Sequence, residues 1–396
     1  MLNKVFGQIG KFVRAFVRSL LLENGRPRNL LMLVILIATA WLMSDIYHFN
    51  TLSEIPISVL DFDQSQTSRT VSRYLDASTM ISVSPERPQS LEEAKRLLIT
   101  GKVAAIVLLP SDFSAMLKRG RQAEVLVASD MSNILTGRNV TTAISGVLGT
   151  VSAGIRIKLF EKMGEKEDRA LARAVPSVSE DNYSFNAAKS YASYLVPGLM
   201  LFFLYVYMTL QNLRIVRSEE SLTEKAAAFL GLIPHGVLLG LVFLYGFMPQ
   251  QELTVHSAYG LVVVLLTAGF FTLSVFEIAL KMLFRKDIFV MQVSVFLAML
   301  SLMFSGITWP TDMFPVPLQY LSSVLPFTPI AHGMRILVHF PADVADLSGV
   351  FSELSMQNFL FVAIISVSLL LTRLFRLFRK LKGNNAGFGR AAKVGA

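Results

Sequence analysis

Six apolar runs, each long enough to cross a bilayer, constrain this chain more than any other feature of its sequence. A hydrocarbon core of about 30 Å requires about 20 residues of helix. We therefore expect an α-helical polytopic membrane protein with six transmembrane helices. The expected spans are residues 29–49, 193–213, 228–248, 258–283, 288–307 and 358–378.

The composition agrees with a membrane protein. The 396 residues are 53% hydrophobic and 16% charged, which is less charge than a soluble domain of this length would carry. The net charge of +9 comes from basic residues that bracket the apolar runs, an arrangement typical of membrane topology and not of nucleic-acid binding. The absence of cysteine excludes disulfides, zinc–thiolate sites and cysteine nucleophiles.

The loops follow the positive-inside rule if the N-terminus is cytoplasmic. The outer loop 249–257 has no Lys or Arg, and the outer segment 308–357 has only Arg335. An even number of spans then places both termini inside, including a basic tail at 379–396. The basic residues predicted inside are Arg214, Arg217, Lys225, Lys281, Arg285, Lys286, Arg373, Arg376, Arg379, Lys380 and Lys382.

Residues 1–28 precede the first span and are basic. Their apolar residues recur at steps of three and four, which predicts an amphipathic helix that lies in the cytoplasmic membrane interface. Packing on the protein's own core is a less favoured alternative, because the segment leads straight into a span. A cleaved signal peptide is also disfavoured, because the small residues Ala38 and Ala40 lie inside the apolar run. The apolar residues are Val5, Phe6, Ile9, Phe12, Val13, Phe16, Val17 and Leu20.

Residues 50–192 have the charged texture of a soluble domain. Expected strands and helices alternate along it, which predicts an inserted extracytoplasmic α/β domain with long helices leading back to the membrane. Ser90 and Glu93 form a capping box, and Gly101 is suited to end the helix that follows. Strands are expected at 55–62, 103–109 and 123–128, and the other helices at 66–77, 111–119 and 134–172.

The outer segment 308–357 has an unusual density of prolines among apolar residues. Non-helical backbone at membrane depth is tolerated only where protein buries it or where it lines a cavity. We expect short re-entrant or interfacial helices, with an ordinary ordered loop as the alternative. The prolines are Pro310, Pro315, Pro317, Pro326, Pro329 and Pro341.

Catalytic motifs are absent from the sequence. There is no G-x-x-x-x-G-K-[ST] phosphate loop, no H-E-x-x-H and no G-x-S-x-G, and the five histidines do not cluster. We expect no catalytic, cofactor-binding or metal site in this chain. The Asp61-x-Asp63-x-Ser65 pattern is a fragment of a calcium loop at most, and a strand end followed by a helix N-cap is the favoured interpretation.

One intramembrane charge stands out. Glu277 lies in the fourth expected span, one turn before Lys281. Ionisable residues inside spans are functional candidates by default. The favoured interpretation is an i,i+4 pair whose lysine reaches the inner interface.

Four passages resemble the permease subunits of type-2 ABC exporters, in the subgroup with a large extracytoplasmic domain after the first span. They are similar to the opening and middle of that domain, to the Val-Pro-Gly that begins the second span, and to the outer-loop signature. Their order and spacing carry the resemblance. The passages are IPISVLDFDQSQTSR (55–69), SLEEAKRLLITGKVAAIVLLPSDFSAMLKRGRQAEVLVASD (90–130), YLVPGLM (194–200) and SGITWPTDMFPVPLQYLSSVLPFTP (305–329).

This resemblance implies a permease for an amphiphilic or hydrophobic substrate, in the inner membrane of a bacterial cell. It implies a second permease copy or paralogue as partner, and a cytoplasmic subunit that binds ATP and Mg²⁺. In Gram-negative bacteria it implies a periplasmic membrane-fusion adaptor for many members. Membrane lipids are expected partners, and nucleic acid is not.

The resemblance also implies two functional segments. Contact with the ATPase falls to the N-terminal helix and to the loop 214–230, where Leu222 and Lys225 depart from the family pattern. In that loop the coupling candidates are Arg214, Arg217, Glu219, Glu220, Thr223 and Glu224. The outer gate candidates are Ser305, Gly306, Pro310, Pro315, Pro326 and Pro329.

A pathway between the spans of two subunits fits this picture. Gly198, Gly231 and Gly306 are expected to let backbones approach closely there. Two alternatives to a transporter of this kind remain. One is a membrane receptor or envelope assembly scaffold that moves no solute. The other is a proton-coupled carrier, which would call for paired acidic residues and inverted repeats in the spans.

Overall fold

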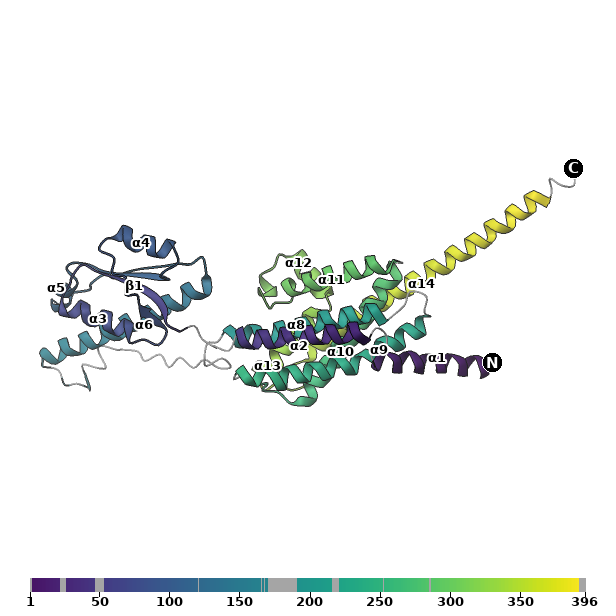
Figure 1. The fold of residues 1–396 in the computed structure, drawn as a ribbon, viewed down its shortest axis with the longest axis horizontal. Coiled ribbons are helices and arrows are strands. Elements are labelled where there is room, and N and C mark those ends of the chain that lie inside the picture. The colour runs from purple at the N-terminus through teal and green to yellow at the C-terminus, as the bar shows by residue number, and fades with distance from the viewer. Residues whose placement is uncertain are drawn as a thin grey trace. The chain divides into compact units, whose positions relative to one another are not determined.

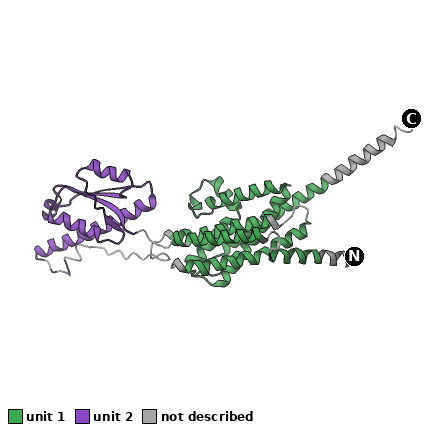
Figure 2. Ribbon diagram, in the orientation of Figure 1, with its two compact units in different colours: residues 1–50, 184–396 green, residues 51–183 purple. Residues whose placement is uncertain are grey.

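The structure, a computed structural model, describes residues 2–21, 26–46, 53–119, 121–164, 166, 168–169, 191–215, 221–251, 253–284 and 286–391. The chain divides into two compact units, residues 1–50 with 184–396 and residues 51–183 (Figure 2). Each unit buries an apolar core of its own. We describe the two units separately as the α/β unit (51–183) and the helical unit.

The α/β unit is built on a four-stranded sheet with the order β2-β1-β3-β4. β1 pairs in parallel with β2 and with β3, and β4 is antiparallel to β3. β2 was missed from the sequence because three residues are too few to show an alternating pattern. The strands are β1 (Ile55–Asp61), β2 (Ile81–Val83), β3 (Ala105–Leu109) and β4 (Leu126–Ser129).

Helices α3, α4, α5 and α6 complete the α/β unit. Ser90 caps α4 and accepts a hydrogen bond from the N–H of Glu93, as the capping pattern predicts. Gly101, with a φ of 71°, follows the end of α4. α6 ends ten residues earlier than expected, because Gly164 follows with a φ of 86° that breaks the helix. The bounds are α3 (Gln66–Asp76), α4 (Leu91–Ile99), α5 (Phe113–Lys118) and α6 (Ile134–Lys162).

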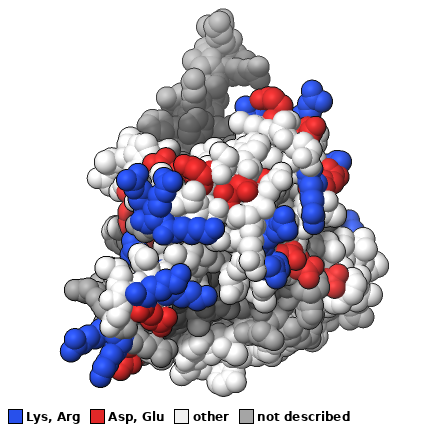
Figure 3. Space-filling view, turned by 90° about the vertical axis from the view of Figure 1, so that its left-hand side faces the viewer, with Lys and Arg blue, Asp and Glu red and all other residues white. Residues whose placement is uncertain are grey.

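The surface of the α/β unit is charged in both signs. Lys95 pairs with Glu92, and Lys102 pairs with Glu86. The face shown in Figure 3 carries Lys and Arg side chains interspersed with Asp and Glu. Such a surface suits water on its outside, while the core beneath it is made of apolar side chains from the strands and from helices α3, α5 and α6.

The helical unit contains the remaining helices, and α8, α9 and α10 run side by side within it (Figure 1). Two short helices, α12 and α13, follow one another with a bend of 85°. The helices are α1 (Leu2–Leu20), α2 (Arg26–Ile46), α8 (Tyr191–Ile215), α9 (Leu222–Val242), α10 (Tyr259–Leu283), α11 (Asp287–Phe304), α12 (Val316–Val324), α13 (Phe327–His339) and α14 (Ser348–Ala391), with short π or 3-10 turns η1 (Phe243–Phe247), η2 (Met248–Gln251) and η3 (Thr311–Met313).

Among the described residues, six helices are long and apolar enough to cross a membrane. They are α6, α8, α9 with η1, α10, α11 and the first part of α14. This set shares five members with the six expected spans and has α6 in place of α2. In α2 the apolar stretch Pro27–Met43 is too short to be counted as a membrane span. α6 is long and apolar enough to be counted, although its Val140 and Ile144 pack in the core of the α/β unit.

The last expected span also begins earlier than predicted. α14 starts at Ser348, so residues 348–357, the last ten of the expected outer segment 308–357, belong to this helix. The fold is that of a multi-pass helical membrane protein.

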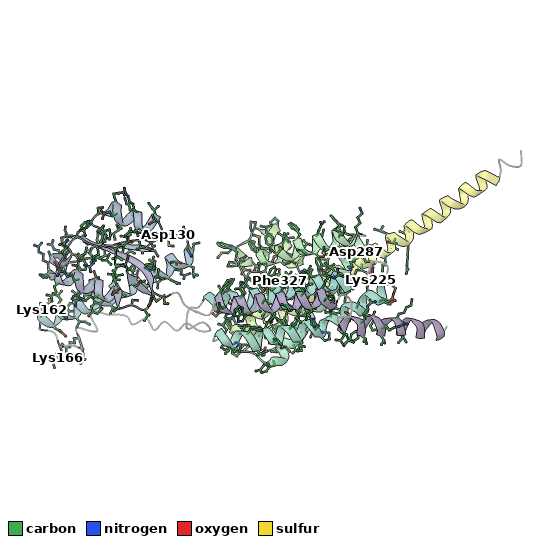
Figure 4. All side chains as sticks on the ribbon, viewed as in Figure 1. Asp130, Lys162, Lys166, Lys225, Asp287 and Phe327 are labelled. Atoms are coloured by element: carbon green, nitrogen blue, oxygen red, sulfur yellow. The ribbon has the colours of Figure 1, made fainter. Side chains whose placement is uncertain are left out.

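α10 lies at the centre of the helical unit and packs against α8, α9, α13 and α14. Phe327 at the start of α13 lies inside the bundle (Figure 4). Its ring centroid is 5.6 Å from that of Phe202 and 5.1 Å from that of Tyr205, both on α8. Aromatic contacts of this kind fasten the outer helix α13 to the bundle.

Candidate functional site

The N-terminal helix α1 packs along α9 by way of small residues. Ala15 and Ser19 are buried, and the Ser19 hydroxyl donates a hydrogen bond to the carbonyl of Ala228. A Cβ atom on Gly231 would lie 2.5 Å from the main-chain oxygen of Phe16. The two backbones therefore approach closely at Gly231, which leaves no room for a side chain between them.

The apolar face of α1 does not make this contact. Ile9, Phe12, Val13 and Val17 remain exposed, on a helix that packs through Ala15 and Ser19 instead. Packing on the protein itself, the less favoured interpretation, is thus seen in the structure, and the interfacial position stays a prediction. α1 packs on the protein itself and also leaves an apolar face suited to the membrane interface.

The start of α9 is a complete capping box. The Ser221 hydroxyl accepts from the N–H of Glu224, and the Glu224 carboxylate accepts from the N–H of Ser221 at 3.0 Å. Lys11 and Arg18 of α1 lie close enough to act electrostatically on Glu224. The first turn of α9 is therefore firmly capped, and the positive charges of α1 favour the ionised form of Glu224.

The other predicted coupling residues are placed as follows. Thr223 lies beside Ser221, with 3.1 Å between their hydroxyl oxygens. Arg214 is in the last turn of α8, and its side chain is outside the described part of the structure. Arg217, Glu219 and Glu220 lie outside the described residues.

Glu277 is fully buried between α10 and α11. Its Oε2 accepts a hydrogen bond from the hydroxyl of Ser294 at 2.9 Å, and its Oε1 has no hydrogen-bond partner among the described residues. Lys281, one turn along α10, acts on it electrostatically.

Lys281 is bound to the end of α8. Its side chain is buried, and its Nζ donates to the carbonyl of Leu213 at 3.2 Å. Leu213 is in the last turn of α8, where carbonyl groups lack partners within the helix, so the ammonium group satisfies one of them.

The outer segment is organised around Gly306. Its carbonyl accepts hydrogen bonds from the hydroxyl of Tyr194 and from the guanidinium of Arg335, and that guanidinium lies over the Tyr194 ring at 5.4 Å. Gly306 has a φ of 81°, a conformation that favours glycine. One carbonyl thus joins α8, the turn after α11, and α13.

The predicted outer gate residues share this region. Ser305, Gly306 and Pro310 line a pocket of about 330 Å³. Pro315 and Pro326 occupy the N-cap positions of α12 and α13. Pro329 is buried in the first turn of α13, where the absence of an N–H costs nothing.

The three glycines singled out from the sequence make close contacts within this one chain. Gly231 faces α1, a Cβ on Gly198 would lie 2.9 Å from Ile307, and Gly306 lies beside Thr311 and Arg335. All three glycines thus serve packing inside the subunit, and a contact between two subunits at these positions stays a prediction.

The Asp61-x-Asp63-x-Ser65 pattern is a strand end and a helix cap. Ser65 caps α3, and Asp61 Oδ1 accepts from the N–H groups of Asp63 and Gln64. Burial raises the pKa of Asp63, but hydrogen bonds from Ser65 and Ser114 outweigh it and hold the pKa below its usual value. In the part of the chain that the structure describes, no cluster of three or more metal-ligating side chains occurs.

Sequence reasoning missed several polar residues around Gly306. Tyr194, Asp312 and Thr328 lie within the passages that carry the resemblance but were not singled out there, and Glu353 is an ordinary acid in the sequence. Arg335 did carry a signal, because it is the only Lys or Arg in the outer segment 308–357.

Comparison with known families connects this geometry to a class of protein. Residues 30–223 match the family described as ABC-2 family transporter protein. The match supports an ABC-2 type permease. It runs from α2 through the α/β unit and α8 into the first turn of α9, and ends one residue before Glu224 of the capping box. Searches of curated proteins and of solved structures found no match.

A permease component of this family implies, in general, a separate subunit that binds ATP. Three of the four passages that suggested the resemblance, 55–69, 90–130 and 194–200, lie inside the matched region. The outer segment that contains Gly306 and Arg335 lies beyond it.

Proposed function

We propose that this chain is the transmembrane subunit of an ATP-driven exporter in a bacterial inner membrane. Both termini are cytoplasmic and the α/β unit is extracytoplasmic. The chain pairs with a second permease, a copy or a paralogue, and the two form the path for an amphiphilic or hydrophobic substrate. ATP and Mg²⁺ are bound and ATP is hydrolysed on a partner subunit, so this chain is not itself an enzyme.

The observation that carries this proposal is the junction of α1 and α9. A transporter driven by a separate ATPase needs a rigid element at its inner end that transmits motion to the spans. α1 meets α9 through backbone contact at Gly231, and the first turn of α9 is held by the Ser221–Glu224 capping box. A displacement of α1 or of the loop before Ser221 is therefore expected to move α9 as well, because the contact between them is rigid.

The charge pattern supports the orientation. The starts of α9 and α11 lie toward the same end of the bundle, as the labels of Lys225 and Asp287 show (Figure 4). The loops at this end are the basic ones, and basic loops are cytoplasmic by the positive-inside rule. With this orientation the α/β unit, inserted in the sequence between α2 and α8, is extracytoplasmic, and a periplasmic adaptor is its proposed partner.

The test is isolation of the tagged full chain from its native membrane. We expect an ATP-binding subunit to co-purify, and vesicles that contain both proteins to hydrolyse ATP. Ser221→Ala removes the cap of α9, which costs about 1 kcal/mol of helix stability, and is expected to lower the coupled ATPase rate.

Ser366→Ala is the matched control, because the Ser366 hydroxyl bonds only to the carbonyl of Val362 in its own helix. This variant is expected to leave the rate unchanged. If no ATP-binding protein co-purifies and the vesicles show no ATPase activity with the candidate partner, the exporter proposal fails. An extracytoplasmic protein that co-purifies in its place would indicate a receptor or assembly scaffold.

A further inference from the structure

The pocket beside Gly306 combines charges of both signs with an unused hydrogen-bonding group. Asp312 and Glu353 line it together with Arg335 and His332. Its volume of about 330 Å³ lies within the range of small-molecule sites. It is formed by η3, α12, α13 and the second turn of α14, so four separate elements converge on it.

The charges of this pocket do not neutralise one another. Within the described part of the chain, neither Asp312 nor Glu353 forms an ion pair with Arg335 or His332. The guanidinium of Arg335 has five N–H donors, and the Gly306 carbonyl takes one of them. A pocket that is lined by opposite charges without an ion pair between them is complementary to a ligand that carries both charges itself.

Thr328 supplies a second, independent observation. Its side chain lines the pocket, only 7% of the residue is exposed, and its Oγ1 has no hydrogen-bond partner among the described residues. A buried hydroxyl without a partner costs free energy. A polar ligand in the pocket would satisfy it.

The edge of the pocket is apolar and exposed. Trp309 and Met313 stand on either side of the pocket-lining residues 310–312, and Tyr320 follows the pocket-lining Gln319. Trp and Tyr are the side chains enriched where hydrocarbon meets the aqueous phase. A ligand with its polar end in the pocket would therefore have its apolar chain in contact with Trp309, Met313 and Tyr320.

We propose that this pocket binds the headgroup of a zwitterionic amphiphile, with its ammonium group toward Asp312 and Glu353 and its anionic group toward Arg335 and His332. The Thr328 hydroxyl completes the site. As the substrate class of the exporter, this inference rests on the proposed function. Binding to the pocket itself does not require the ATPase, so the two are tested separately.

The chain provides its own reporter for the binding test. It has two tryptophans, Trp41 and Trp309, and Trp309 is at the edge of the pocket. In a Trp41→Phe background, the full chain in maltoside micelles is titrated with lysophosphatidylethanolamine, without any ATP-binding subunit. We expect a saturable change in Trp309 fluorescence.

Three variants identify the groups that bind. Glu353→Gln and Asp312→Asn are each expected to weaken binding about tenfold, since about 1.4 kcal/mol corresponds to a factor of ten. Thr328→Val is expected to weaken binding while thermal stability stays equal or rises, because it removes a buried hydroxyl that has no partner. Asp45→Asn, at an exposed residue near the end of α2, is the control and is expected to bind like the parent.

Four further ligands test the chemistry. Dodecyl phosphate, dodecyltrimethylammonium and a neutral alkyl glucoside are each expected to bind more weakly than the zwitterion. Phosphoethanolamine alone tests the apolar chain and is also expected to bind more weakly. Equal binding by any of these four, or unchanged binding in both carboxylate variants, would overturn the inference. Binding without a co-purifying ATPase would retain the pocket and refute only the exporter.

Discussion

Arg335 and Gly306 are joined by a hydrogen bond from the guanidinium to the main-chain carbonyl, across 29 positions of sequence. The same carbonyl accepts from Tyr194 at 3.1 Å, so α8 and α13 are held to one point on the turn that follows α11. Gly306 also lines the polar pocket. The outer end of the bundle therefore depends on the backbone conformation of a single glycine.

Gly306→Ala is expected to destabilise the protein by about 1–2 kcal/mol, the cost of a left-handed conformation for a residue with a Cβ. The new Cβ would also lie 3.4 Å from the Arg335 guanidinium. The measurement is thermal unfolding of the full chain in detergent. Gly260→Ala is the control, because nothing lies within 4 Å of a Cβ there and its φ is ordinary. Equal unfolding temperatures for the two variants would contradict the role of Gly306.

Gly231→Ala is expected to loosen α1 from α9, because the Cβ would meet the Phe16 carbonyl oxygen at 2.5 Å and backbone atoms cannot move aside cheaply. The expected readout is faster trypsin cleavage after Arg14 and Arg18. In Gly349→Ala, where a Cβ meets nothing within 4 Å, cleavage should proceed at the parental rate. A parental rate in Gly231→Ala would show that the contact is not tight.

Ser294→Ala is expected to cost about 1–3 kcal/mol, because it removes the hydroxyl that donates to the fully buried carboxyl of Glu277. Unfolding by dodecyl sulfate in mixed micelles measures this cost. In a Glu277→Leu background the same change is expected to cost less, since the group left without a donor is gone. The same cost in both backgrounds would show that the pair is not coupled.

The α/β unit is expected to lose stability in acid through Asp63. Its folded-state pKa lies below the ordinary value of 3.8 because of hydrogen bonds from Ser65 and Ser114, which outweigh burial. A depressed pKa stabilises the fold above the ordinary value, and this contribution is lost as the pH falls toward and through the lower folded pKa.

Ser114→Ala tests this linkage through the bond from Ser114 to Asp63 Oδ1. The variant is expected to be less stable than the parent at pH 7, with the difference shrinking below about pH 4. Circular dichroism of the full chain during thermal unfolding, from pH 7 to 3, provides the measurement. Ser111→Ala, at an exposed serine, is the control. A difference that stays constant with pH would exclude Asp63 as its origin.

Much of the fold follows from local pattern. Apolar runs of span length predict α8, α9, α10 and α11 closely, because burying helix backbone in hydrocarbon requires nothing but length and apolar side chains. Ser90 predicts the start of α4 for a similar reason, since a cap acts on its own first turn. β2 was missed because so short a strand exists only by pairing with β1.

Membership of a span also depends on tertiary contacts. α6 is long and apolar enough to cross a membrane, yet its Val140 and Ile144 are buried in the core of the α/β unit. Composition alone cannot distinguish these surroundings, because lipid and an apolar core present the same chemistry to a helix.

The sequence by itself determined the membrane class, the positions of α8, α9, α10 and α11, and the charge pattern around the apolar runs, since each of these depends on residues close together in the chain. Only the tertiary structure decided that Gly231 meets Phe16, that Lys281 reaches Leu213, and that Gly306 joins Tyr194 to Arg335. These contacts join residues 29 to 215 positions apart, and the packing of whole helices, not local preference, brings them together.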